Sequence, residues 1–150
     1  MRIWVDADAA PRPVKEMLFR AAMRVQIEVI LVANQSLRTP KSKYVRSVVV
    51  GKGFDVADEY IADAAEAGDL VITADIPLAA AAVEKGATCI DPRGEVIDKS
   101  NARSRLLMRN FMEQQREAGE LTGGPKAYSD RDKRAFAGAL DRALAKARRS

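Results

Sequence analysis

Two aspartates separated by a single residue follow the first apolar segment of the chain. Residues 2–5 (Arg-Ile-Trp-Val) lead directly into Asp6, Ala7 and Asp8. In an extended segment, residues two apart project to the same side, so the two carboxylates could share a divalent cation. Asp also favours turns by bonding its own backbone, and a turn before Pro11 would account for both residues without chemistry. The motif therefore indicates either an oxygen-ligand metal site or a turn.

The scarcity of histidine and cysteine limits the kinds of catalytic and metal-binding site that this chain can form. The chain contains no histidine and a single cysteine, Cys89. Ser-His-Asp and Cys-His triads, histidine general bases and structural zinc sites are therefore excluded. Cys89 lies in an apolar segment and is expected to be a buried, inert thiol. The remaining candidates for catalysis are carboxylates, lysines and a bound metal.

The alternation of apolar segments with amphipathic ones predicts an α/β fold. Strands are expected at residues 2–5, 28–33, 45–50, 69–73 and 88–90, and helices at 13–24, 56–68 and 76–85. This order predicts a mostly parallel central sheet flanked by helices, a Rossmann-like three-layer arrangement. One further helix capped by Ser100 and another starting at a Ser129–Asp132 capping box are expected to cover the sheet. Residues 1–150 are expected to form a single domain.

Polar residues follow four of the predicted strands. Asp6, Asn34, Asp75 and Asp91 each stand directly after an apolar run. Parallel strands end at the same edge of a sheet, so these residues are expected to meet there. Each also has a turn or N-cap explanation, and for Asp75 this explanation is strong because Pro77 follows it. Their convergence favours a metal or phosphate site over four separate turns.

Two more aspartates, Asp55 and Asp58, stand at the start of the second predicted helix. Carboxylates in this position complement the helix dipole, which is a sufficient structural reason for both. Three residues along a helix correspond to a rotation of about 300°, so the two side chains lie on neighbouring faces. One of them could face the predicted site while the other caps the helix.

Basic and polar residues that could contact phosphate groups surround the predicted edge. The net charge is +4, and the 58 residues from Arg93 carry 14 basic against 8 acidic side chains. The segment 37–44 is a basic loop with one aromatic residue, a composition that suits a phosphate backbone but also an ordinary solvated loop. The candidates for phosphate or nucleic-acid binding are Arg12, Asn34, Ser36, Arg38, Lys41, Lys43, Thr122, Gly123 and Gly124.

Five segments, in order and across nearly the whole length, resemble the bacterial YaiI/YqxD family: WVDADAAP, LVANQSLRTP, GFDVADEYI, GDLVITADIPLA and LTGGP. That family is similar in pattern to PIN-like and NYN-type metal-dependent nucleases. The resemblance implies a PIN-like domain in which Asp6, Asp58 and Asp75 are catalytic. It implies metal ligands among Asp6, Asp75 and either Asp55 or Asp58, with Asp8 and Asp69 as lesser candidates. Ala10 replaces the cysteine of the family's usual DADACP, so a thiol role at that position is absent.

Three functions compete. The leading hypothesis is a nuclease dependent on Mg²⁺ or Mn²⁺, with nucleic acid as its partner and RNA favoured over DNA. A haloacid-dehalogenase-like phosphohydrolase would use Asp6 as nucleophile and Asp8 as general acid, although Ala10 and the long separation of Asp69 from Asp75 disfavour it. A non-catalytic nucleic-acid-binding module would bind with strong salt dependence and without metal.

No run approaches the roughly 20 apolar residues of a membrane helix and no leader precedes the first strand, so a cytoplasmic protein is expected.

Overall fold

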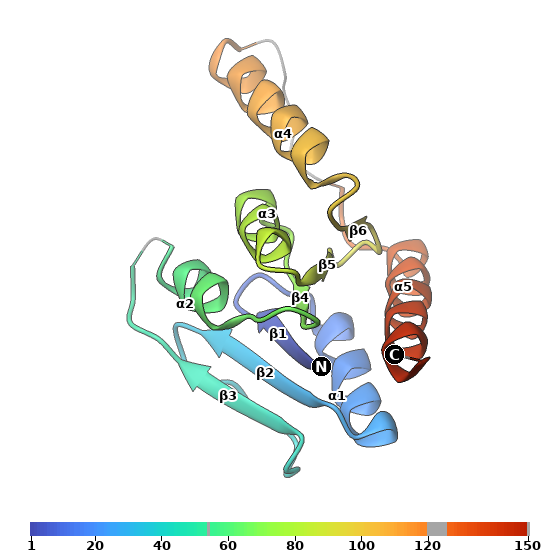
Figure 1. Ribbon diagram of the computed structural model, residues 1–150. Helices are drawn as coiled ribbons and strands as arrows, with labels where there is room; N and C mark the ends of the chain where they lie inside the picture. Colours follow the sequence, from blue (N-terminus) through green and yellow to red (C-terminus); the bar gives the residue numbers. More distant parts are fainter. Residues whose placement is uncertain (54, 120–125, 150) are drawn as a thin grey trace.

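A central sheet organises the structure (Figure 1). The computed structural model describes residues 1–53, 55–119 and 126–149. Within these residues the strands are β1 Arg2–Asp6, β2 Glu28–Ala33, β3 Val45–Val49, β4 Leu70–Ile72, β5 Thr88–Ile90 and β6 Val96–Ile97. Their order across the sheet is β3-β2-β1-β4-β5-β6, with β6 antiparallel to β5 and the other neighbours parallel. The prediction of a mostly parallel α/β sheet is confirmed.

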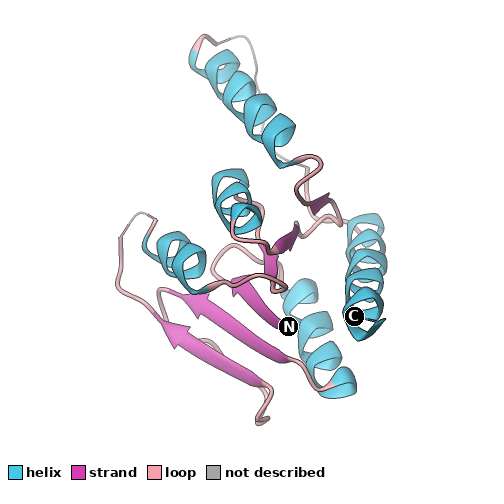
Figure 2. Ribbon diagram, viewed as in Figure 1, coloured by secondary structure: helices cyan, strands magenta, loops and turns pink. Residues whose placement is uncertain are grey.

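Helices cover both faces of this sheet (Figure 2). They are α1 Arg12–Val25, α2 Val56–Ala64, α3 Ile76–Glu84, α4 Ala102–Glu117 and α5 Asp130–Arg149. Side chains alternate between the two faces of a strand, and β1 shows both layers. Val5 belongs to the core cluster formed with α1 and α5, which includes Phe136. Trp4 belongs to the cluster on the other face with Ile61 of α2 and Leu78 of α3. The result is the predicted three-layer arrangement.

The fourth helix departs from expectation. α5 lies beside α1 on the sheet, whereas α4 extends away from the sheet and contacts α3 (Figure 1). Its side chains Leu107, Met108 and Phe111 are 61%, 59% and 54% exposed. The prediction that both C-terminal helices cover the sheet is therefore correct for α5 and wrong for α4. The other helices pack on both faces of the sheet, and α4 packs against α3 instead.

Local capping explains where several helices begin. Asp75 accepts a hydrogen bond from the backbone N–H of Leu78 (3.0 Å), as expected for the N-cap of α3. Ser129 and Asp132 form the predicted capping box, with Oγ of Ser129 accepting from the Asp132 N–H (3.2 Å). Ser100 does not cap α4, because its N–H and hydroxyl both donate to Asp98 and the helix begins at Ala102. None of the helices in the described ranges is long and apolar enough to span a membrane.

The strand order reverses at β1, and this reversal positions the candidate site. From β1 the sheet continues through β2 to β3 on one side and through β4 to β5 on the other. In open parallel sheets a crevice forms at such a switch point, outside the carboxyl ends of the strands. β1 ends at Asp6, and β4 ends immediately before Thr73. Polar side chains from both strand ends therefore meet at this edge, where Thr73 donates a hydrogen bond to Asp6.

Candidate active site

Three aspartates from separate elements come together at the switch point. Asp6 is the last residue of β1, Asp75 is the N-cap of α3, and Asp58 lies in the first turn of α2. All three side chains are half-buried. The charge of Asp75 acts on Asp6, and the charges of Asp75 and Asp6 both act on Asp58. The structure therefore brings together the three residues that the resemblance marks as catalytic, and it gathers them from three distant parts of the chain.

Thr73 connects two of these aspartates. Its side chain is buried, and its Oγ1 donates to Oδ2 of Asp6 at 3.0 Å. The same Oγ1 accepts a hydrogen bond from the backbone N–H of Asp75, also at 3.0 Å. Thr73 thereby fixes the position of Asp6 relative to the start of α3. Thr73 was not among the site residues predicted from the sequence, although a hydroxyl residue directly after an apolar strand was a visible signal.

Asp6 and Asp58 hold protons more strongly than ordinary carboxyl groups, because the pKa of each is raised. Burial raises the pKa of Asp6, as do the charges of Asp75 and Asp8, while the Thr73 hydrogen bond opposes the rise. For Asp58, burial, a hydrogen bond with the Asp75 side chain and the charges of Asp75, Asp6 and Asp55 raise the pKa from 3.8 to about 7. Carboxylates crowded in this way favour either a shared proton or a bound cation.

The raised pKa of Asp58 predicts a specific dependence of stability on pH. Its folded-state pKa of about 7 exceeds the unfolded value of 3.8. The tighter proton binding of folded Asp58 therefore stabilises the folded state fully below pH 3.8, and this stabilisation is lost as the pH rises through 7. Asp58→Asn cannot ionise, so above pH 7 it should be the more stable protein by about 1 kcal/mol after solvent screening, or roughly 3 °C in melting temperature.

Thermal melting between pH 4 and pH 9 in EDTA would measure this difference. The exposed Asp63 lies on the same helix and provides the matched control, Asp63→Asn. We expect the wild type and Asp63→Asn to lose stability in parallel as the pH rises, while Asp58→Asn loses less. Identical profiles for all three proteins would contradict the assignment of the pKa to Asp58.

The remaining carboxylate of the first motif, Asp8, connects β1 to β2. It is exposed, and its Oδ2 accepts a hydrogen bond from the backbone N–H of Asn34 at 2.8 Å. Oδ1 of Asn34 is buried and has no hydrogen-bond partner within the described part of the chain. Asp8 and Asp6 thus bind different groups, although their charges interact. The proposal that Asp6 and Asp8 act as nucleophile and acid of a phosphohydrolase stays a prediction.

Asp55 is the outer of the two α2 aspartates. It is the N-cap residue of α2, is exposed and has a left-handed backbone (φ 66°). Its backbone carbonyl accepts the N–H of Glu59 at 2.9 Å, which starts the helix. Its charge is the smallest of the contributions to the raised pKa of Asp58. Of the two aspartates, the structure therefore places Asp58 closer to the site.

Two other acidic candidates are not brought to the site. Asp91 follows β5, where its Oδ1 accepts the N–H groups of Arg93 and Glu95, both at 2.9 Å. It forms the turn before β6, so the expected convergence of this residue with the strand-end aspartates is not observed. Asp69 precedes β4 and therefore lies at the opposite, amino-terminal edge of the sheet. Its carboxylate accepts three hydrogen bonds and is 7% exposed, which indicates a structural role.

The predicted phosphate-binding residues separate into groups. Arg12, at the start of α1, and Arg38, in the loop after β2, line the same cavity. Ser36 and Lys41 are exposed, and Nζ of the exposed Lys43 lies 5.2 Å from the centre of the Tyr44 ring. The candidates Thr122, Gly123 and Gly124 lie outside the described residues.

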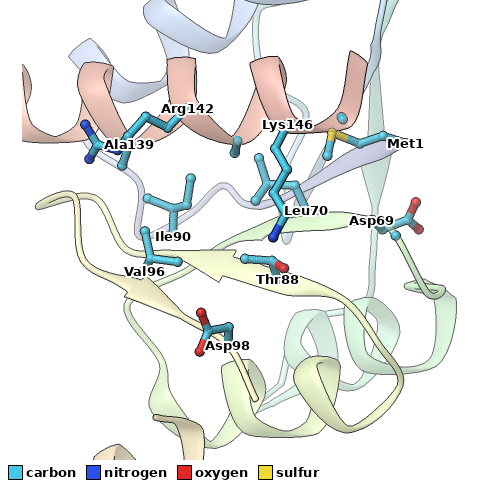
Figure 3. Close-up of a pocket in the computed structure, with 13 residues that line it drawn as sticks. Met1, Asp69, Leu70, Thr88, Ile90, Val96, Asp98, Ala139, Arg142 and Lys146 are labelled. Carbon is cyan, nitrogen blue, oxygen red and sulfur yellow. The ribbon is translucent and has the colours of Figure 1, made fainter. Parts of the chain in front are cut away.

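A larger cavity of about 510 Å³ lies at the other end of the sheet (Figure 3). It lies between the amino ends of β4 and β5 and helix α5, where Lys146 extends toward Thr88 and Asp98 lies nearby (Figure 3). Cys89 of β5 is buried, and burial raises the pKa of its thiol to about 12, as expected for an inert side chain. Neither feature is part of the aspartate site.

Comparison with known proteins identifies the family. Residues 4–146 match the family model described as "Uncharacterized BCR, YaiI/YqxD family". The chain is 60% identical over 146 residues to a UPF0178 protein of Dechloromonas aromatica (97% of each chain) and 59% identical over 150 residues to one of Hahella chejuensis (100% of each). It is 55% identical over 150 residues to the UPF0178 protein YaiI of Escherichia coli O81, covering 100% of this chain and 99% of the relative. No solved structure is significantly similar. The chain therefore belongs to the YaiI/YqxD family.

Proposed function

We propose that the aspartate site hydrolyses phosphodiester bonds in nucleic acid with the help of Mg²⁺ or Mn²⁺, and that it prefers RNA to DNA. The observation that carries this proposal is the convergence of Asp6, Asp58 and Asp75 at the switch point of the sheet. Crowded carboxylates in a crevice repel one another, and a divalent cation removes that repulsion. Hard cations of this kind prefer oxygen ligands, and the site offers no nitrogen or sulfur ligand because the chain has no histidine and Cys89 is buried elsewhere.

The arrangement of the side chains suits a cation held by few protein ligands. Among the described residues, no group of three or more His, Cys, Asp or Glu side chains is placed to hold a metal ion. Mg²⁺ in phosphate chemistry is commonly held by only one or two carboxylates, with water and substrate oxygens completing its shell. Asp6 and Asp75, which Thr73 positions together, are the residues that would hold it. Oδ1 of Asp6 accepts no hydrogen bond from any described residue and is available for this contact.

The side chains around the crevice would then have separate tasks. The Thr73 hydroxyl orients the Asp6 carboxylate, and the N-cap hydrogen bond to Leu78 holds Asp75 in place. Asp58, with a pKa of about 7, is about half protonated at neutral pH and would release its proton when a cation binds. Arg12 and Arg38, which line one cavity, would supply positive charge for a phosphate next to the scissile one. A bound cation would supply activation of water and neutralisation of the leaving oxygen.

A cleavage assay tests the proposal directly. Purified wild-type protein would be incubated with fluorophore–quencher RNA and DNA oligonucleotides in Mn²⁺, in Mg²⁺ and in EDTA. We expect cleavage with either cation and none in EDTA, with RNA cleaved faster than DNA. Asp75→Asn should reduce the rate by at least about 100-fold, a typical loss when a group that stabilises transition-state charge is removed.

The same assay distinguishes the competing functions. Hydrolysis of a small phosphomonoester, with no cleavage of oligonucleotides, would favour the phosphohydrolase over the nuclease. Binding of oligonucleotides without cleavage under any metal condition would refute the nuclease and favour a non-catalytic binding module. Cleavage that persists in Asp75→Asn would show that the activity resides elsewhere or in a contaminant.

A further inference from the structure

A second cavity opens between helix α1 and the loop that follows β2. Its volume is about 490 Å³, within the range of about 300–1,000 Å³ typical of small-molecule sites. Helix α1 contributes one wall and the segment from Leu37 to Pro40 contributes the other. The lining side chains are Arg12, Lys15, Glu16, Phe19, Leu37, Arg38, Thr39 and Pro40.

The charges of this cavity favour an anion. Three of its lining residues, Arg12, Lys15 and Arg38, are cationic, and Glu16 is the single acidic one. Within the described part of the chain, none of the three cations forms a hydrogen bond or ion pair. Arg12 and Lys15 stand three residues apart on a helix and so lie on one face, across the cavity from Arg38. Three cationic side chains without ion-pair partners around one cavity provide a binding surface for phosphate.

The other lining residues provide an apolar surface beside these charges. Phe19, Leu37 and Pro40 are half-buried, so part of each side chain remains accessible from the cavity. Phe19 lies one turn after Lys15 on α1, farther from Arg12 toward the C-terminal end of the helix. A cavity that combines cations with an apolar wall matches a nucleotide, which carries a phosphate and a flat base that stacks on aromatic and apolar side chains. Inorganic phosphate alone would leave that wall unused.

Both walls of the cavity are directly connected to the aspartate site. Arg12 follows Asp8 by four residues, and Leu37 follows Asn34 by three. Asn34 donates its N–H to Asp8 at 2.8 Å, so the two connecting segments are joined where they leave the sheet. The cavity therefore begins close to the carboxyl edge of the sheet, where Asp6 lies.

We propose that this cavity binds the nucleotide next to the scissile phosphate, and that the substrate is single-stranded. This inference rests on the proposed phosphodiesterase function, because it assigns a second position along the same substrate. A base can contact the wall formed by Phe19, Leu37 and Pro40 only when it is unpaired. In a duplex the bases are stacked and paired, and only the phosphates would reach the cations.

Fluorescence anisotropy in EDTA would test the cavity without any cleavage. The probes are 12-nucleotide oligo-uridylate and oligo-thymidylate, and a 12-base-pair duplex. The triple variant Arg12→Gln, Lys15→Gln, Arg38→Gln is compared with the charge-matched control Arg131→Gln, Lys133→Gln, Arg148→Gln on exposed positions of α5. We expect the cavity variant to bind single strands on the order of tenfold more weakly. The negative slope of log affinity against log salt should become shallower by about 2 for three lost contacts.

Each outcome supports or overturns the inference. A loss confined to the cavity variant supports it, and a loss with only the RNA or only the DNA probe assigns the cavity to that nucleic acid. Equal losses in both triple variants, equal binding of the duplex, or no binding by the wild type would overturn it. If the triple variant does not fold, Arg38→Glu, on the loop, replaces it; it should also bind single strands more weakly than the wild type, with a salt slope shallower by about 0.7 for the one lost contact. Normal cavity-dependent binding with no cleavage in Mn²⁺ would refute the proposed function while leaving the binding site in place.

Discussion

Asp6→Asn is expected to reduce metal-dependent cleavage by at least about 100-fold while leaving the fold intact. Asp6 contributes an oxygen at the crevice, and the amide of asparagine carries no charge with which to hold a cation. The amide oxygen can still accept the Thr73 hydrogen bond, which in the wild type is 3.0 Å long. Replacement also removes a charge that raises the pKa of Asp58, so the protein without metal should be at least as stable as the wild type. Single-turnover cleavage of the RNA probe with saturating Mn²⁺ measures the loss.

Thermal melting supplies a readout that does not depend on activity. A ligand that binds only the folded state stabilises it by about 2.7 kcal/mol at a concentration 100 times its dissociation constant. Mn²⁺ should therefore raise the melting temperature of the wild type and of Asp63→Asn, the exposed control on α2. It should not raise that of Asp6→Asn. Full activity of Asp6→Asn, or an unchanged metal response, would exclude the switch point as the metal site.

The sequence was sufficient to predict Asp6 and Asp75 as neighbours because a general rule places them. Both follow apolar strands, and the carboxyl ends of parallel strands meet at one edge. The prediction depended only on the strand pattern, which the structure confirms for β1 and β4. The same rule brought Asp91 to that edge, but it could not show that Asp91 would bond the N–H groups of the turn before β6. The rule locates a residue, and local hydrogen bonds then decide whether its carboxylate is available.

Other features depend on contacts between distant segments and could not be predicted from the sequence. The choice between Asp55 and Asp58 is set by the rotation of α2 about its axis, which follows from packing of Ile61 against the sheet. The role of Thr73 depends on the pairing of β1 with β4 across 67 residues. The outward position of α4 is also a tertiary feature, since α4 contacts α3 and leaves Leu107, Met108 and Phe111 exposed. In each case periodicity identified the element, while tertiary packing determined what the element contacts.

Asp69→Ala is expected to destabilise the fold by about 3–5 kcal/mol without impairing catalysis. The Asp69 carboxylate is 7% exposed and accepts the N–H of Arg2 at 3.0 Å, the indole Nε1–H of Trp4 at 3.0 Å and the N–H of Glu66 at 2.9 Å. These bonds join the start of β1 to the turn before β4. Alanine leaves all three donors without an acceptor, and one of them is the indole N–H of the buried Trp4.

Urea unfolding would measure this loss, and a double variant would identify its cause. Trp4→Phe removes the indole donor, so the loss caused by Asp69→Ala should be smaller in that background. Asp141→Ala, which breaks a pair with Arg24 whose side chains are 63% and 66% exposed, should cost less than 1 kcal/mol. Cleavage by folded Asp69→Ala at low temperature should equal that of the wild type, because Asp69 lies at the opposite edge of the sheet from Asp6. A folded but inactive variant would instead place Asp69 in the catalytic machinery, in disagreement with the three hydrogen bonds that its carboxylate already accepts.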